Sequence, residues 1–162
     1  AIFEAEAFNL YRRTGELPAP ALTYLDMGAP AAARQLLSGF YPAEQHAWRW
    51  SARRFTVVLK APEAARSVGA TLELHLYVPP EQVSRLGPLT IKGDVNGYPL
   101  RAETFSSQGS FTYQCAIPPS AFKRGVAIAS FAFDKAVPSS AGEGRELGAV
   151  ISSLGFTPVP YH

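Results

Sequence analysis

Between Trp48 and Phe156 the hydrophobic residues occur in short stretches that recur about every ten positions. Proline, glycine, asparagine and serine separate these stretches, and no long helical period lies between them. This rhythm is typical of antiparallel strands joined by tight turns. We therefore predict an all-β fold, an antiparallel two-sheet β-sandwich that is jelly-roll-like, with about eight or nine strands and one or two short helices.

The clearest alternation of apolar and polar residues runs from Ala70 to Val78. Successive side chains of a strand point to opposite faces, so one face of this segment is apolar and the other polar. The apolar set is Leu72, Leu74, Leu76 and Val78, and the other set is Glu73, His75 and Tyr77. We expect the first set in the core and the second on a wetter face.

Asn96-Gly97 is the strongest short-range hairpin signal in the chain, because a type I′ turn needs positive φ at both central residues. It predicts a hairpin between strands at 89–95 and 98–105. The almost unbroken apolar run from Gly125 to Phe133 predicts a central strand covered on both faces. The last strand is expected at 146–156.

The elements expected before the hairpin include both strands and short helices. The first strand of the domain is expected at Leu22–Met27, followed by a short helix that starts at Pro30, continues through Leu37 and is ended by Ser38-Gly39. Further strands are expected at 46–51 and 55–60, with a turn or bulge at 52–54 between them. Residues 81–86 have room for at most two helical turns before Gly87-Pro88.

These elements predict one sandwich domain at 22–157, preceded by an arm at 1–21 and followed by a tail at 158–162. The chain begins at Ala1 rather than at a methionine. We expect that a preceding segment was removed, with a signal or a membrane anchor as the candidates. No stretch of the sequence approaches the roughly 20 apolar residues of a transmembrane helix.

Charge and cysteine content exclude several classes of function. Lys and Arg total 15 against 13 Asp and Glu, and the basic residues are scattered, so no nucleic-acid footprint is visible. Cys115 is the only cysteine, which rules out an intrachain disulfide and a cysteine-based zinc site. Because it alternates with Phe111, Tyr113 and Ile117, we expect it in the core. His46, His75 and His162 lack metal-ligand spacing, so no metal and no cofactor is predicted.

The motifs that catalysis would need are missing from the sequence. There is no Gly-x-Ser-x-Gly elbow and no glycine-rich phosphate loop between a strand and a helix. Glycosidase chemistry needs two carboxylates at a set separation. Glu73 and Glu103 lie on predicted strands and have the potential to meet on one sheet face, but nothing selects them over the other acids. We expect that the chain is not an enzyme.

Four motifs occur in a set order along the chain. They are Gly39-Phe40-Tyr41-Pro42-x-Glu44, Trp48-Arg49-Trp50-Ser51, Val95-Asn96-Gly97 and Gly144-Arg145-Glu146-Leu147-Gly148. Over residues 22–156 this series resembles the jelly-roll β-sandwich modules found with bacterial glycosyltransferases and other cell-envelope polysaccharide proteins. The chain has Glu143-Gly144-Arg145 where those modules usually carry an aspartate. The resemblance implies an accessory, non-catalytic module of a bacterial protein in a carbohydrate or envelope context, outside the cytoplasm.

The first two motifs supply a candidate ligand site. Tyr41, Trp48 and Trp50 offer aromatic faces on which the C–H face of a sugar ring can stack, and Glu44, His46 and Arg49 offer polar partners for its hydroxyl groups. In the alternative interpretation Trp48 and Trp50, which share one face of a strand, anchor the core. Arg145 is a further candidate for ligand binding, or else forms a bidentate structural pair with Glu44.

Three functions from different classes remain open after the sequence has been considered. The first is recognition of carbohydrate by an accessory module of an envelope polysaccharide protein. The second is an interaction or structural domain that packs on another protein domain. The third is a small sandwich hydrolase with paired carboxylates in a cleft.

Overall fold

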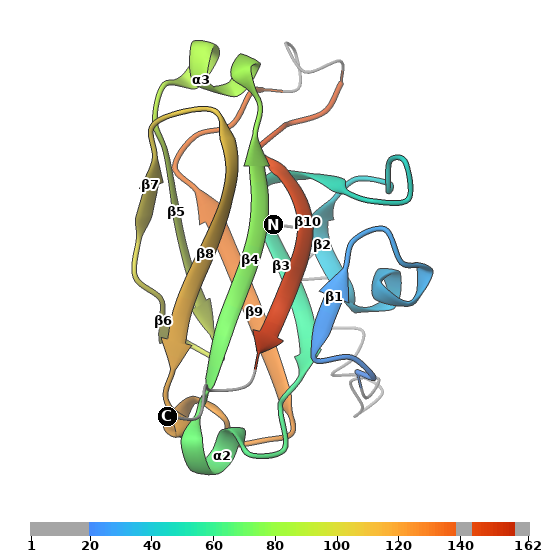
Figure 1. Cartoon of the computed structure of the whole chain (residues 1–162), viewed down its shortest axis with the longest axis vertical. Coiled ribbons are helices and arrows are strands. Elements are labelled where there is room, and N and C mark those ends of the chain that lie inside the picture. Colours follow the sequence, from blue (N-terminus) through green and yellow to red (C-terminus); the bar gives the residue numbers. More distant parts are fainter. Residues whose placement is uncertain (1–19, 139–143, 158–162) are drawn as a thin grey trace.

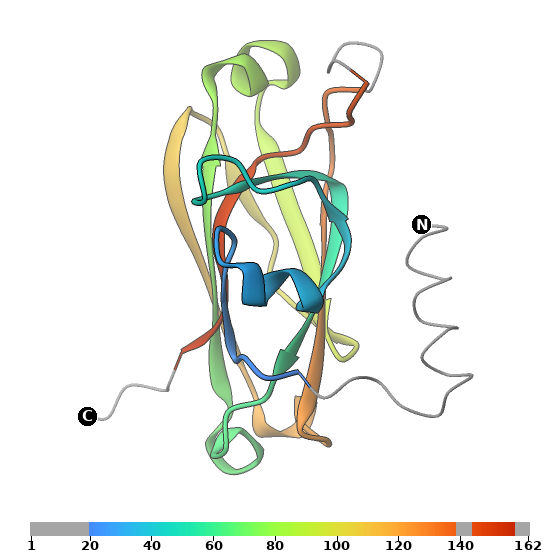
Figure 2. The ribbon, with the colours of Figure 1, turned by 90° about the vertical axis from the view of Figure 1, so that its right-hand side faces the viewer.

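The computed structural model describes residues 20–138 and 144–157. These residues form ten antiparallel strands, which confirms the predicted all-β sandwich. The strands lie in two layers that face each other across the core (Figures 1 and 2). Ten strands exceed the eight or nine predicted. A strand at Leu36–Phe40 was not expected and the strand expected at 98–105 is two short strands, whereas the two strands expected at 46–51 and 55–60 form one. The tail, and nearly all of the arm expected at 1–21, lie outside the described residues.

The first sheet contains the strand with the clearest alternation. Its order is β1 (Tyr24–Asp26), β10 (Val150–Thr157), β4 (Ala70–Val78) and β8 (Gly109–Ile117), with every pair antiparallel. Leu72, Leu74, Leu76 and Val78 are at most 2% exposed, so the predicted apolar face of β4 forms part of the core. The face that carries Glu73, His75 and Tyr77 is the outer surface of the sandwich.

The second sheet is formed by the remaining strands. It contains β2 (Leu36–Phe40), β3 (Arg49–Lys60), β9 (Val126–Phe133), β5 (Leu89–Val95), β6 (Tyr98–Pro99) and β7 (Glu103–Phe105). β9 lies between β3 and β5, which confirms its predicted central position. Alternate residues of β9 are only half-buried, so the expectation that both of its faces are fully covered was wrong.

β3 is a single strand of 12 residues, where the sequence predicted two strands separated by a turn at 52–54. Arg49 and Trp50 pair with β10 of the first sheet, whereas residues 54–60 pair with β9 of the second. The residues expected to turn the chain are those at which β3 passes from one sheet to the other. This strand therefore holds the two layers together at one edge.

The helix expected from Pro30 to Leu37 is shorter than predicted. It is a 3-10 helix, η1 (Pro30–Gln35), and the residues expected to end it belong to β2. The buried side chain of Gln35 ends η1 by bonding outside the helix: Nε2 donates to the carbonyls of Leu22 and Val58, and Oε1 accepts from the Leu22 N–H. A fixed end at Gln35 leaves the next residues free to pair with β3.

The predicted Asn96-Gly97 hairpin is present between β5 and β6, with φ of 52° and 85° at the two turn residues. Its second strand is interrupted between β6 and β7, so the expected strand at 98–105 is two short pieces.

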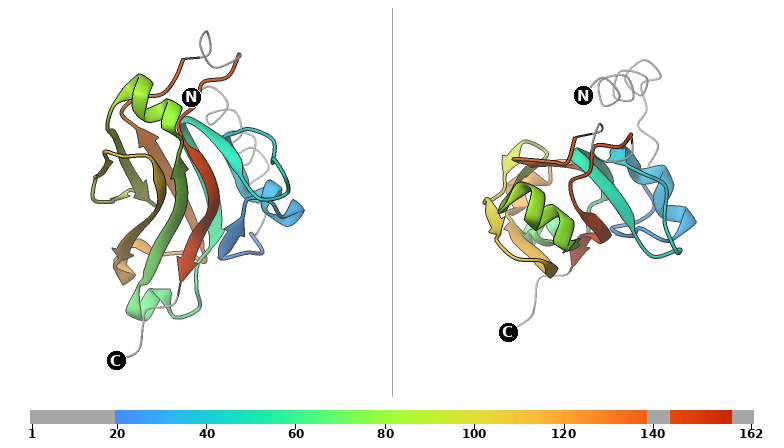
Figure 3. Two further views of the ribbon diagram at one scale, coloured as in Figure 1. Left: turned by 45° about the horizontal axis from the view of Figure 1, so that its top comes forward. Right: turned by 90° about the horizontal axis from the view of Figure 1, so that it is seen from above.

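Short helices close the two ends of the sandwich. α3 (Pro80–Leu86) confirms the two-turn helix and lies across one end (Figure 3). Its buried Gln82 donates to the carbonyls of Leu147 and Gly148, which ties α3 to the segment before β10. The opposite end carries α2 (Ala65–Val68) and the 3-10 helix η2 (Pro119–Ala121). None of the helices among the described residues is long and hydrophobic enough to cross a bilayer.

Candidate functional site

A groove of about 740 Å³ lies on the outer face of the first sheet, where β10, β4 and β8 meet the start of β3. Cross-strand pairing builds its floor, because Trp50 pairs with Val150, His75 with Thr112 and Tyr77 with Ser110. Among the described residues, the groove is lined by Glu44, Trp48, Trp50, His75, Leu76, Tyr77, Pro79, Ser110, Phe111, Thr112, Val150 and Ser152. Aromatic rings and hydroxyl groups predominate in this set.

Three aromatic side chains of the groove combine accessibility with large flat faces. Trp48 and Trp50 are half-buried and do not belong to the central hydrophobic cluster, so the alternative in which both anchor the core is not what the structure shows. Tyr77, on the outer face of β4, is 40% exposed. Half-buried rings fixed in a groove are suited to stack on a flat apolar face of a ligand while their positions are held by the fold.

The turn at 44–48 brings Glu44 and Trp48 to the groove. The two residues face each other as an isolated bridge, in which the Glu44 N–H donates to the Trp48 carbonyl over 2.8 Å. The tip of this turn packs on Gly28, where a Cβ atom would lie 1.8 Å from the His46 carbonyl oxygen. His46, an expected polar partner of a ligand, therefore supports the turn through its backbone and is not among the lining residues.

Arg49 is not among the lining residues of the groove. Its Nε donates to the carbonyl of Met27 over 3.1 Å and its Nη1 to the carbonyl of Tyr41 over 3.2 Å. Tyr41 is also outside the groove, with its hydroxyl donating to the Glu146 carbonyl over 2.8 Å. Both candidates thus hold together the segments that position Trp48 and Trp50.

Arg145 and Glu44 lie side by side, as the structural alternative expected, but they do not form a bidentate pair. One Nη1–Oε2 separation of 3.9 Å joins them, and the Glu44 Oε2 atom is buried with no hydrogen bond. The Arg145 guanidinium lies over the Tyr41 ring, 5.3 Å from its centroid. Stacking on Tyr41 sets the orientation of the guanidinium, which leaves its N–H groups poorly aligned with the carboxylate.

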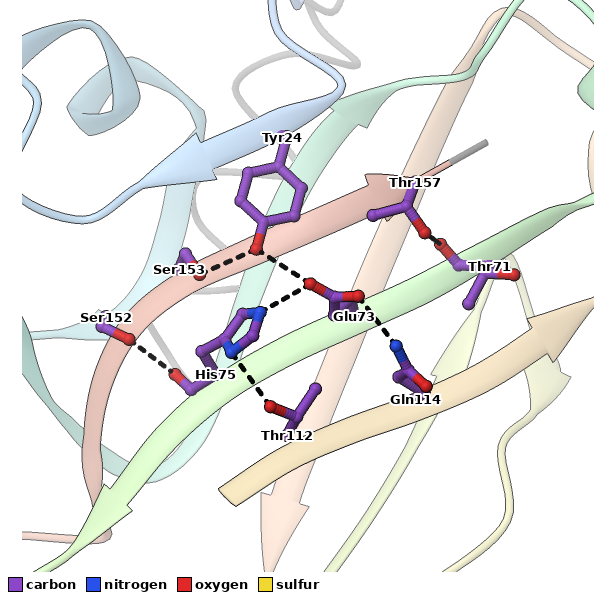
Figure 4. Close-up of polar contacts among 9 residues, drawn as sticks. All are labelled: Tyr24, Thr71, Glu73, His75, Thr112, Gln114, Ser152, Ser153 and Thr157. Atoms are coloured by element: carbon purple, nitrogen blue, oxygen red, sulfur yellow. Dashed lines mark hydrogen bonds and ion pairs between the residues drawn. The ribbon is translucent and has the colours of Figure 1, made fainter. Parts of the chain in front are cut away.

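A polar network covers the outer face next to the groove and includes part of its floor (Figure 4). Glu73 lies at its centre and accepts from Gln114 Nε2 over 2.9 Å. His75 Nε2 lies 2.5 Å from the same carboxylate, and the Tyr24 hydroxyl donates to it over 3.4 Å. Three strands, β1, β4 and β8, therefore contribute to one carboxylate site.

The network connects the groove floor to Glu73. His75 Nδ1 lies 3.1 Å from the Thr112 hydroxyl, and in the neutral tautomer whose Nε2 donates to the Glu73 carboxylate this Nδ1 accepts from Thr112. The lone pairs of the Thr112 oxygen then remain available to a ligand hydroxyl. Ser110 and Ser152 add further hydroxyl groups along the same floor.

The electrostatics of the network follow from these contacts. The hydrogen bond from Gln114, followed by the one from His75, holds the pKa of Glu73 below its ordinary value. Burial is the main cause that raises the pKa of Tyr24, which is further raised by the neighbouring Glu73 charge. Glu73 is thus favoured as an anion and Tyr24 as a neutral hydrogen-bond donor.

Thr112, His75 and Glu73 follow the hydroxyl–imidazole–carboxylate order of a hydrolase triad. A hydroxyl nucleophile also needs hydrogen-bond donors placed at the developing oxyanion. The nearby side-chain donors of Gln114 and Tyr24 point at Glu73 instead.

The pair of carboxylates considered from the sequence does not form. Glu73 lies on β4 of the first sheet, whereas Glu103 lies on β7 of the second and pairs with Arg101 at 3.1 Å. Within the described part of the chain, no three His, Cys, Asp or Glu side chains are grouped so that they could hold a metal ion.

Sequence reasoning missed Tyr77, Thr112, Ser110 and Ser152 as groove residues. The alternation of β4 already placed Tyr77 on the outer face, so its exposure was a usable signal. The other three required the register of β8 and β10 against β4. This register pairs residues 31 to 47 positions apart for β8 and 73 to 86 positions apart for β10, and it leaves no local trace in the sequence.

No protein-family model matches the sequence, and none of the curated proteins matches it. Solved structures do share its fold. A carbohydrate-binding module described for specific mannan recognition, TmCBM27, has a TM-score of 0.50 and 14% identity, with 85% of this chain and 96% of the module covered. At 14% identity, this similarity shows only that the two chains share the β-sandwich fold.

Two larger enzymes contain a similar region. One is the acetyl xylan esterase Est2A from the rumen bacterium Butyrivibrio proteoclasticus, with a TM-score of 0.49, 8% identity, and 87% of this chain and 34% of the esterase covered. The other is the 4-O-methyl-α-glucuronidase BtGH115A, with a TM-score of 0.49, 8% identity, and 89% and 18% covered. The chain thus spans about a third of the first enzyme and less than a fifth of the second.

Proposed function

We propose that this chain is a non-catalytic carbohydrate-binding module and that the groove on the first sheet is its binding site. The observation that carries the proposal is the placement of Trp48, Trp50 and Tyr77 beside a floor of hydroxyl groups. A sugar ring has an apolar C–H face and a rim of hydroxyls, so it needs both kinds of surface at once.

The charge of the groove favours a glycan that carries no acidic group. Glu44 is the only carboxylate among the described lining residues, and no lysine or arginine accompanies it. An acidic sugar would meet the Glu44 carboxylate, whose cationic neighbour Arg145, at 3.9 Å, does not line the groove, and the repulsion costs binding free energy. From the sequence motifs we also propose a cellular setting. The module would be an accessory part of an envelope polysaccharide protein, next to a glycosyltransferase.

A glycan-array screen followed by isothermal titration calorimetry tests the proposal. Mannan oligosaccharides belong in the screen because a module with this fold is described for mannan recognition. We expect Trp48→Ala, Trp50→Ala and Tyr77→Ala each to weaken binding by about tenfold or more. Tyr98→Ala is the matched control for neutral glycans, since Tyr98 is 39% exposed against 40% for Tyr77 but lies on β6 of the other sheet, where it lines a separate hollow.

The outcomes separate the candidate functions. Loss of binding in the groove variants, with normal circular dichroism and an unaffected Tyr98→Ala, supports the proposal. Binding that survives all three groove substitutions would place the site elsewhere. Failure of every neutral glycan to bind would overturn it and favour the domain-packing alternative, in which the same aromatic surface contacts another protein domain.

A further inference from the structure

A second hollow, of about 520 Å³, lies in the second sheet at the end of the sandwich that carries α2 and η2. It forms where the turn of the β5–β6 hairpin meets the loop between η2 and β9. Asn96, Ser120, Lys123 and Arg124 are among its lining residues. The groove on the first sheet shares none of them.

The charge of this hollow is of one sign. Lys123 and Arg124 are both exposed and both line it, and no Asp or Glu is among its described lining residues. Neither cation forms an ion pair or a hydrogen bond with another described residue. Adjacent cations around a concavity create a positive potential that attracts anions. A planar guanidinium and an ammonium together match the oxygen atoms of a phosphate, sulfate or carboxylate group.

The loop that carries the two cations is held in place before any ligand arrives. Asn96 Nδ2 donates to the Ala121 carbonyl over 3.0 Å and to the Val126 carbonyl over 3.4 Å, and its Oδ1 accepts from the Ile128 N–H over 2.8 Å. The Gly125 carbonyl accepts from the Ala61 N–H over 2.9 Å. Because both ends of the loop are fixed, little conformational entropy remains to be lost on binding.

We propose that this hollow is a binding site for an oxo-anionic group, with Lys123 and Arg124 as its cationic contacts and the Ser120 hydroxyl as an additional donor. The anionic group can belong to a free ion or be attached to an acidic glycan as a phosphate, sulfate ester or uronate carboxylate. The site is independent of the groove in the first sheet, which offers no cation to such a group.

A third hollow, which is also lined by two cations, supplies a control for the proposed site. Arg54 and Lys92 also line a concavity in the second sheet, of about 340 Å³, but there the carboxylate of Asp94 accompanies them. The double substitution Arg54→Ala with Lys92→Ala therefore removes the same net charge from the protein. It leaves the hollow at 120–126 unchanged.

The test is a titration of the whole chain, followed by amide chemical shifts, with inorganic phosphate, inorganic sulfate and a uronate oligosaccharide as separate probes. We expect shifts at 96 and 120–126, and a loss of affinity of about tenfold or more in the Lys123→Ala, Arg124→Ala double variant. Affinity should also fall when salt is raised from about 0.05 M to about 0.3 M. Binding of the inorganic ions identifies a free anion as sufficient, and binding of the uronate alone identifies an attached group.

The proposal would be overturned if no probe binds or if the chemical-shift changes fall elsewhere in the chain. It would also be overturned if the Arg54→Ala, Lys92→Ala control loses as much affinity as the Lys123→Ala, Arg124→Ala variant. That result would mean that the net charge of the protein alone attracts the anion. Trp48→Ala leaves this hollow untouched and is expected to bind the probes normally. Failure of the groove proposal and failure of this one are therefore distinguishable.

Discussion

The Nε2 atom of His75 lies 2.5 Å from the Oε1 atom of Glu73, two residues earlier on the same face of β4. Residues i and i+2 of a strand point to the same side, so the two side chains meet without a change in backbone course. Gln114 and Thr112 of β8 complete their hydrogen bonds from the neighbouring strand. The polar floor of the groove therefore depends on the register between β4 and β8.

Glu73→Gln should change how stability depends on pH. The pKa of Glu73 is lowered in the folded chain, chiefly by Gln114 and then by His75, so its carboxylate stabilises the fold above the unfolded-state pKa of about 4.3. This contribution is lost as pH falls through the folded-state value. We expect Glu73→Gln to cost about 1 to 2 kcal/mol at neutral pH and to lose less stability than the wild type on acidification.

Urea denaturation between about pH 3 and pH 7 measures this difference. Glu103→Gln is the control, because Glu103 is also a strand glutamate but pairs with the exposed Arg101 side chain. Equal acid profiles for the wild type and Glu73→Gln would show that the network does not stabilise the anion.

Local patterns were sufficient to predict much of the fold. β4 matches its predicted bounds because strict alternation over nine residues leaves only one face to bury. The hairpin at Asn96 matches because positive φ is required at two adjacent residues. In both cases the determining interactions lie within a few residues of one another in sequence.

The errors come from interactions between distant segments. Residues 52–54 of β3 are polar enough to suggest a turn, yet the Ser51 carbonyl accepts from Gly148 N–H and continues the strand pairing. Glu73 is hydrogen-bonded to Gln114, 41 residues away, so the network around it was not visible in the sequence. Of the seven candidate site residues, three line the groove, namely Glu44, Trp48 and Trp50. The other four, Tyr41, His46, Arg49 and Arg145, are not among its lining residues.

Gly28→Ala should displace the turn at 44–48 and with it one wall of the groove. A Cβ atom at this position would lie 1.8 Å from the His46 carbonyl oxygen, a backbone atom that moves only with the turn. We expect a loss of about 1 to 3 kcal/mol in stability, a shift in tryptophan fluorescence and weaker glycan binding. Gly125→Ala is the control, because nothing lies within 4 Å of its added Cβ. Unchanged fluorescence in Gly28→Ala would contradict the prediction.

Gln35→Leu should destabilise the fold without altering the groove. The amide of Gln35 satisfies the Leu22 N–H and the carbonyls of Leu22 and Val58, and its side chain is buried. Leucine would leave the Leu22 N–H and the Val58 carbonyl without that partner, while the Leu22 carbonyl keeps its bond from the Lys60 N–H. We expect a cost of about 1 to 3 kcal/mol for a buried unsatisfied group. Urea denaturation measures the loss, with the exposed Gln108→Leu as the control. If Gln35→Leu loses less unfolding free energy than Gln108→Leu, water has replaced the hydrogen bonds of the Gln35 amide.

Alkaline pH should unfold the protein through Tyr113. Burial is the main cause that raises the pKa of this phenol, and its hydroxyl donates to the Arg101 carbonyl over 2.7 Å. The folded chain keeps Tyr113 neutral while the unfolded chain ionises it at about pH 10, so stability is complete below that pH and falls as pH rises above it. We expect Tyr113→Phe to be less stable at neutral pH, by about 1 kcal/mol, but to lose less stability between about pH 9 and pH 11. Urea denaturation in that range, beside tyrosinate absorbance, measures both effects. Ionisation of every tyrosine at its ordinary pKa in the folded chain would contradict this assignment.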